Sequence, residues 1–208
     1  MRARLGLLLA GQAVRVRALN LKNKPPEMLA ASAKGTVPIL VLNEGEADES
    51  ILDESLDIML WALKNQDPLD LLFSSQPSVL TSMLDLIKHN ALIFIDLLEK
   101  YKHASRYHDF SQLYYRRQCE VFIAMLEGRL QDKEFFMGDK ASLADYALLP
   151  FIRQFARVDR KWYLQSPYPK LRGWLNRHLQ QPLFTKAMAK YPLWIDNHEE
   201  SWLGPPPK

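Results

Sequence analysis

The stretch that decides the fold is TVPILVL, residues 36–42, a β-branched, apolar run opened by the step Val37-Pro38. Proline cannot donate to a β-ladder, so it belongs at the start of a strand, and we expect a strand over 36–42. Residues 43–46 contain Gly45 and predict a hairpin turn, with residues 47–52 as the returning strand. A helix is expected from Asp53 to about residue 63.

Upstream of this stretch the chain also mixes helix and strand. Residues 1–10 predict a helix that Gly11 ends. Residues 14–19 alternate apolar and basic side chains, which indicates a half-buried strand. Residues 27–33 predict a short helix. The charged and then apolar start also looks a little like a signal peptide, so an exported protein beginning near Val14 is a further hypothesis.

Downstream, every periodic segment predicts helix. Asp67-Pro68 and residues 74–77 interrupt the pattern and suggest a linker. The sequence therefore predicts an α/β domain over 1–66 and an all-helical domain over 77–200. Its helices are expected over 78–101, 110–130, 142–158, 168–180 and 182–190. The tail, residues 201–208, contains the run Gly204-Pro205-Pro206-Pro207 and is expected to be poorly ordered.

Composition narrows the class of protein. The 208 residues are 48% hydrophobic and 25% charged, with a formal net charge of +3 spread along the chain. This gives no case for nucleic acid or an anionic membrane as a partner. No apolar run is expected to span a membrane. The five histidines show no ligand spacing, so no metal site is predicted.

The chain has a single cysteine, Cys119, which excludes an intrachain disulfide and fits a reducing, cytoplasmic compartment. Cys119 lies on an apolar helical stripe. We expect a buried structural thiol there, with a reactive nucleophile as the alternative.

Two segments carry binding chemistry. A cis bond at Val37-Pro38 would turn the backbone N–H and C=O of Val37 outward, where an extended peptide could pair with them. An ordinary trans proline at a strand start is the alternative. At Asp53-Glu54-Ser55 a strand gives way to a helix, and the free N–H groups of that helix favour a carboxylate. Simple capping by Asp53 or Ser55 is the alternative there.

A third segment is structural. Ser142 and Asp145 have the spacing of a capping box, in which each side chain satisfies the other's backbone N–H. They predict the start of a helix that contains Pro150.

Together and in this order, these segments resemble the cytosolic glutathione transferases. In that family a Val-Pro step, a Glu-Ser pair and a Ser-x-x-Asp box recur at similar separations. The run LNLKNKP, residues 19–25, is similar to the omega class, as is Asp145-Tyr146 followed by Pro150-Phe151. The resemblance implies a thioredoxin-like glutathione-binding domain joined to an all-helical domain.

The resemblance also implies roles for individual residues. Val37, next to Pro38, would pair its backbone with the cysteinyl part of glutathione. Glu54 and Ser55 would hold the γ-glutamyl end, and Lys24 would approach the glycyl carboxylate. Glutathione would be a co-substrate, and a homodimer is typical of the family.

The second substrate, a small electrophile or disulfide, would bind between the domains. Candidate residues for that site are Tyr107, Tyr115 and Phe151.

One departure from the family pattern matters. Family members begin with a strand and a loop that carries the catalytic Cys, Ser or Tyr, whereas residues 1–5 here already look like the first helix. The thioredoxin-like domain is therefore expected to be incomplete, and no catalytic residue can be named. Two hypotheses stay open: a transferase whose true start lies upstream of Met1, or a non-catalytic member that binds glutathione or serves as an interaction module.

Overall fold

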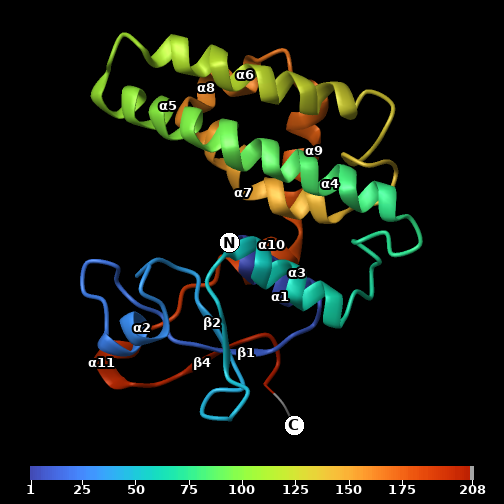
Figure 1. Ribbon diagram of the computed structural model, residues 1–208. Coiled ribbons are helices and arrows are strands. Elements are labelled where there is room, and N and C mark those ends of the chain that lie inside the picture. The colour runs from blue at the N-terminus through green and yellow to red at the C-terminus, as the bar shows by residue number, and fades with distance from the viewer. Residues whose placement is uncertain (207–208) are drawn as a thin grey trace. The chain divides into compact units, whose positions relative to one another are not determined.

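The computed structural model describes residues 1–206 (Figure 1). Its contacts divide the chain into two compact units, each of which is described by itself. The first combines residues 1–69 with the chain from Pro182 onward, and the second runs from Asp70 to Gln181. This division differs from the predicted domains of 1–66 and 77–200, because the segment after Pro182 contacts the N-terminal elements.

A pair of closely packed helices forms the core of the first unit. Helix α1 (Arg2–Leu9) contacts α3 (Ser55–Asn65) and α10 (Pro182–Ala187). A Cβ atom at Gly6 would lie only 2.7 Å from the Cα of Met59, so α1 and α3 can approach this closely only with glycine there. The chain leaves α1 through Gly11, whose φ of +66° is in the left-handed region, as the sequence predicted.

The strands of the first unit form two short antiparallel pairs. Strand β2 (Leu40–Leu42) pairs with β3 (Ser50–Leu52), which confirms the predicted hairpin. Both strands are shorter than predicted, and residues 36–39 precede β2 rather than belonging to it. Helix α2 (Pro26–Ala31) lies between β1 (Val14–Val16) and this hairpin in the sequence.

Strand β1 pairs with a strand that the sequence analysis missed. The prediction of a poorly ordered tail is wrong for β4 (Ser201–Leu203), which pairs antiparallel with β1, Val14 opposite Leu203. The side chains of Arg15 and Arg17 both contact the Glu200 carboxylate, at 3.2 and 2.8 Å. A three-residue strand gives too little periodic signal to be found from sequence, and its partner lies almost the whole chain away.

The second unit is all helical within the part of the chain that the structure describes. In Figure 1, α4 (Pro77–His89), a π-helical turn, η1 (Asn90–Phe94), and α5 (Ile95–Tyr107) form one rod beside α6. Helix α6 (Gln112–Arg129) contacts α5 and α9. The unit is completed by α7 (Leu143–Val158), α8 (Arg160–Gln165) and α9 (Pro169–Gln180), while α11 (Trp194–Asn197) belongs to the first unit.

The rod from Pro77 to Tyr107 is longer than the predicted helix over 78–101. By length and composition it is the one helix among residues 1–206 that could cross a membrane, with a mean hydropathy of 1.3 in its best window. The expectation that no run reaches this length is therefore corrected. The core helix of a soluble protein can have the same length and composition. Of the apolar 18-residue stretch in this rod, 28% is buried, and Met83, Ile87 and Leu98 are buried residues of the rod.

The buried carboxylate of Asp145 organises the second unit. Its Oδ2 atom accepts hydrogen bonds from the Ser142 backbone N–H (2.9 Å) and hydroxyl (2.6 Å). Its Oδ1 atom accepts from the Phe136 backbone N–H (3.1 Å) and from Trp174 Nε1 (2.8 Å). The predicted capping box is confirmed, and it also joins the loop before α7 to α9.

Cys119 lies on α6 and is fully buried, as predicted. Burial, with a smaller contribution from Glu120, raises the pKa of the thiol to about 12. Since the thiolate is the reactive form of cysteine, Cys119 is a structural residue and not a nucleophile.

Asp145→Ala should destabilise the protein by about 4 kcal/mol, because four donors lose their acceptor inside the core. Asp159→Ala is the matched control. That carboxylate caps α8 by accepting from the Trp162 N–H, and its loss should cost about 1 kcal/mol. Urea unfolding followed by tryptophan fluorescence measures both, and equal losses would contradict the central role of Asp145.

A buried imidazole makes the stability of the second unit dependent on pH. His178 packs against Phe135, Tyr146 and Trp174, and burial lowers its pKa below the usual value. The unfolded chain, with a His pKa of about 6.5, therefore binds a proton at a pH where the folded chain does not. The stability that comes from the neutral imidazole is complete above the histidine pKa of the unfolded chain, about 6.5. It is lost as the pH falls from there toward the lower pKa of His178 in the folded chain.

Replacing this imidazole should flatten the acid limb of the stability profile. We expect His178→Gln to lower stability at pH 7.5 but to reduce the fall in free energy of unfolding between pH 7 and pH 5. His103→Gln, at an exposed position on α5, should leave the slope unchanged. Urea titrations at several pH values measure the slope, and a steeper fall in the His178 variant would refute this assignment.

Candidate functional site

The start of α3 gathers charged side chains in the first unit. Glu54 precedes the helix as its N-cap, Ser55 is its first residue, and the first N–H groups of α3 have no partner within the helix. Lys34 Nζ lies 2.9 Å from Asp53 Oδ1 and 2.8 Å from Glu54 Oε1. The Ser32 hydroxyl donates to Asp53 Oδ2 at 2.8 Å, so Asp53 is held away from the helix end.

A buried cation completes this group. Arg2 is only 9% exposed, and its Nη1 atom lies 3.5 Å from the hydroxyl oxygen of Ser55. Burial lowers the pKa of Arg2 to about 10, and the nearby Glu54 carboxylate acts in the opposite direction. Arg2 stays protonated at neutral pH, so a positive charge and the N-terminal end of the α3 dipole point to the same place.

Lys24 lies beside Gly35, in the segment that joins Lys34 to the Val37-Pro38 step. Gly35 has φ of +57°, and a Cβ atom there would lie 3.1 Å from Lys24 Nζ. Lys24 therefore contacts the segment that links Lys34 to Val37. The Val37-Pro38 peptide bond is cis, as the sequence suggested, and the Val37 side chain is 50% exposed.

The electrostatics of the cluster suit a zwitterionic ligand. Lys34 lowers the pKa of Asp53, and its contacts with Glu54 and Asp53 raise the pKa of Lys34. Cations at Arg2 and Lys24 and an exposed carboxylate at Glu54 offer partners for carboxylates and for an ammonium group. The alternative of Asp53 as the α3 cap does not hold, because its carboxylate is bonded to Ser32 and Lys34.

Sequence reasoning missed Arg2 and Lys34. A signal for Arg2 was present, since it shares the buried stripe of α1 with Leu5, Gly6 and Leu9, where an arginine is out of place. Lys34 carried no such signal, because its contact with Asp53 and Glu54 depends on how the loop before β2 folds back.

The predicted second-substrate residues lie in the other unit. Tyr107 ends α5 and is 63% exposed, Tyr115 lies in the first turn of α6, and Phe151 is in the middle of α7. Tyr115 contacts Tyr114 edge to face, with ring centroids 5.3 Å apart. Their role in binding an electrophile stays a prediction.

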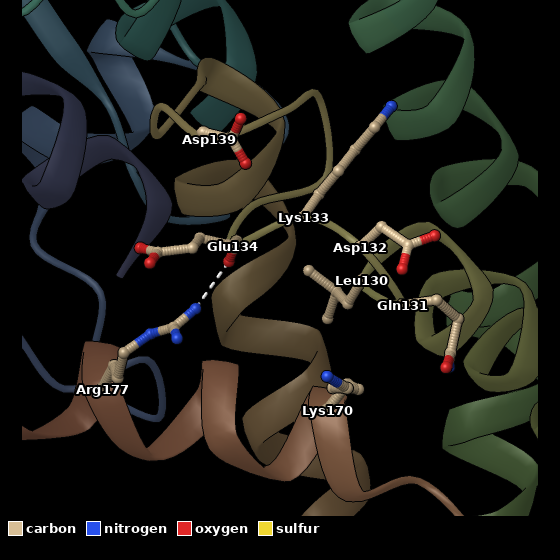
Figure 2. A pocket seen from close by; sticks show the side chains of 8 residues that line it. All are labelled: Leu130, Gln131, Asp132, Lys133, Glu134, Asp139, Lys170 and Arg177. Atoms are coloured by element: carbon tan, nitrogen blue, oxygen red, sulfur yellow. Dashed lines mark hydrogen bonds between the residues drawn. The ribbon is translucent and has the colours of Figure 1, made fainter.

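The second unit also has a polar hollow of about 260 Å³, which Figure 2 shows. It lies between the end of α6, the loop before α7, and α9. The Arg177 guanidinium donates to the Glu134 carbonyl oxygen at 2.6 Å. Its lining contains lysine and arginine as well as aspartate and glutamate, so neither sign of charge prevails and no class of ligand is favoured. None of the predicted site residues lines this hollow.

Both units match domains of one known protein family. Residues 1–69 match the family model "Glutathione S-transferase, N-terminal domain", and residues 116–177 match "Glutathione S-transferase, C-terminal domain". The chain belongs to the glutathione S-transferase family. The predicted fold is thereby confirmed: a small thioredoxin-like domain with few strands and a mostly helical domain.

Individual relatives agree with this family. Glutathione S-transferase U19 of Arabidopsis thaliana is 25% identical over 192 residues, covering 90% of this chain and 84% of that protein. A glutathione transferase from Pseudomonas putida has a TM-score of 0.76 at 17% identity, over 89% of this chain and 84% of that one. The Omega 2C transferase of Trametes versicolor has a TM-score of 0.70 at 17% identity, over 91% and 88%. The relation to the omega class stays a prediction.

Proposed function

We propose that this protein binds glutathione at the start of α3 and transfers it to, or uses it to reduce, small electrophilic or disulfide substrates. The proposal rests on three contacts around that helix end. Arg2 contacts Ser55, Glu54 contacts Lys34, and Lys24 lies beside Gly35. The similar structure from Pseudomonas putida holds one glutathione disulfide per subunit, which supports this ligand.

Each end of the tripeptide has a partner of opposite charge in this arrangement. The γ-glutamyl carboxylate meets Ser55, the guanidinium of Arg2 and the free N–H groups of α3, while Glu54 accepts from the ammonium group. Lys24 pairs with the glycyl carboxylate. The backbone of Val37, before Pro38, pairs with the cysteinyl residue as an added strand.

The chemistry of the reaction depends on the residue that holds the glutathione thiolate. A serine or tyrosine would stabilise the thiolate for attack on an electrophile, and a cysteine would form a mixed disulfide. Cys119 is excluded from both roles by its burial. The second candidate function is a glutathione-fold protein that binds without catalysis.

The proposal extends to assembly and location. Apolar side chains are exposed along the rod and α6, among them Leu92, Ile93 and Val121, and such a surface fits a homodimer. Tyr107, Tyr115 and Phe151 would line the electrophile site. A single cysteine fits the cytoplasm.

Calorimetric titration with glutathione tests the binding site. Ser55→Ala and Glu54→Gln should each weaken binding about ten-fold, because the first removes a hydroxyl donor to the ligand carboxylate and the second removes the negative charge that faces the ligand ammonium group. Glu46→Gln is the matched control, since it neutralises an exposed carboxylate in the β2–β3 turn, and it should bind like the wild type. Equal affinity in all four proteins would exclude this site.

Activity assays separate the two candidate functions. Chain 1–208 is assayed for glutathione conjugation of an electrophile and for reduction of a mixed disulfide. The proposed transferase should turn over at least one of these substrates, whereas binding without turnover would favour the second candidate function. Robust turnover that is lost in Ser55→Ala would establish a glutathione-dependent enzyme.

A further inference from the structure

The positive charge of this protein is concentrated in part of the helical unit. Residues 146–181 contain seven lysines and arginines but only one acidic residue, Asp159. Since the whole chain has a net charge of only +3, the remaining residues are together net negative. The expectation of a charge spread along the chain is therefore corrected. A surface made by this segment can attract an anionic partner that the net charge alone does not favour.

Exposed basic side chains meet at one end of the helical unit, where α5 passes into α6 and α7 is followed by α8 (Figure 1). Lys102 Nζ lies 3.1 Å from Gln154 Oε1, which joins α5 to α7. The Arg116 Cζ atom lies 4.3 Å from the centroid of the Trp162 ring, which joins α6 to α8. Each exposed cation of this end is within four residues of one of these contacts. They are Arg106, Arg117, Arg157, Arg160 and Lys161.

The carboxylates of this end do not neutralise those five charges. Within residues 1–206 the ion pairs here use Arg116, which lies 3.4 Å from Glu120 and 3.9 Å from Asp159. Asp159 also accepts from the Trp162 N–H, and Asp109 accepts from the Ser111 N–H at 2.7 Å. The five exposed cations are therefore available to a partner.

The same end carries apolar side chains that the fold leaves in water. Phe110 is fully exposed and lies in the short turn between α5 and α6. The turn has a defined shape, because His108 has a left-handed φ of +53° and the Asp109 side chain accepts from the Ser111 N–H. Three further exposed apolar side chains belong to α6 and α8, namely Leu113, Tyr114 and Leu164. A cluster of this kind indicates an interaction surface.

The combination of charge and apolar groups narrows the class of partner. A second copy of this chain would bring like charges together, which is unfavourable. Nucleic acid bases stack on aromatic side chains, but Leu113 and Leu164 offer no ring for stacking. An anionic bilayer satisfies both features, because its headgroups attract cations and its acyl boundary accepts phenylalanine and leucine alike. Tyrosine is also favoured at the level of the headgroups.

We propose that this end of the helical unit docks reversibly on an anionic phospholipid bilayer. Phe110, Leu113 and Leu164 enter the boundary between headgroups and acyl chains, and the exposed arginine and lysine side chains pair with the lipid phosphates and carboxylates. The docking surface contains no residue of the glutathione cluster, so it needs no bound glutathione.

Co-sedimentation of the full chain with lipid vesicles tests the docking. Vesicles of phosphatidylcholine with about 30% phosphatidylserine should bind at least about ten-fold more tightly than phosphatidylcholine alone, because the cations need an anionic surface. Added sodium chloride should weaken the binding, since salt screens charges that lie in water.

Paired variants separate the charged and the apolar contributions. Arg160→Gln with Lys161→Gln should weaken binding about twenty-fold, because each cation near an anionic surface contributes roughly five-fold. Lys64→Gln with Lys133→Gln removes the same charge at exposed positions outside this surface and should bind like the wild type. Phe110→Ser should weaken binding about ten-fold through lost apolar burial. Leu69→Ser, at an exposed leucine elsewhere, is its control.

A fluorescent label then locates the contact. Cys119 is buried, so a polarity-sensitive, thiol-reactive dye labels the exposed thiol introduced in Phe110→Cys selectively. Its emission should shift to shorter wavelength when anionic vesicles are added, whereas the label in Leu69→Cys should not respond. Far-UV circular dichroism identifies any variant that has not folded.

The proposal would be overturned by equal binding to neutral and anionic vesicles, or by equal affinity of the wild type and Phe110→Ser. A label in Phe110→Cys that does not respond to bound vesicles would reject it as well. A single-stranded oligonucleotide that binds in place of vesicles, and loses affinity in Arg160→Gln with Lys161→Gln, would assign the surface to nucleic acid instead. None of these results depends on whether glutathione is bound or turned over.

Discussion

The carboxylate of Asp145 is the constraint on which the helical unit depends. A buried charge without partners is severely unfavourable, so the loop before α7, the first turn of α7 and the indole of α9 must all bring donors to it. The interaction therefore fixes three segments at one point. The aromatic stack of Phe136, Trp174 and His178 then packs around that point. The capping box therefore does more than start α7. Its carboxylate also fixes the point around which the aromatic side chains pack.

In the first unit the close approach of α1 and α3 has a comparable role. Gly6 allows the two helices to touch, and this contact brings Arg2 to the start of α3. At its other end α1 contacts α10, and Leu8, Leu183 and Leu203 line a hollow there. One helix thus has a charged site at its beginning and an apolar hollow at its end, with different chemistry at each.

Much of this could be predicted from local sequence. The Val37-Pro38 step, the β2–β3 hairpin, the start of α3 and the box at Ser142 each have a signature within a few residues, and the structure agrees with them. The contacts that were missed are nonlocal. Pairing of β1 with β4, the contact of Arg2 with Ser55, and that of Lys34 with Glu54 join residues that no periodic pattern connects.

The pairing of Val14 with Leu203 has a consequence for synthesis. Residues 70–181 can collapse as soon as they have left the ribosome, since their contacts lie within one continuous stretch. The α/β unit must wait, because β4, the partner of β1, is made only after residues 70–181. During that interval the edge of β1 has no partner and is open to other chains, so the helical unit is expected to fold before the pairing of β1 with β4 completes the first unit.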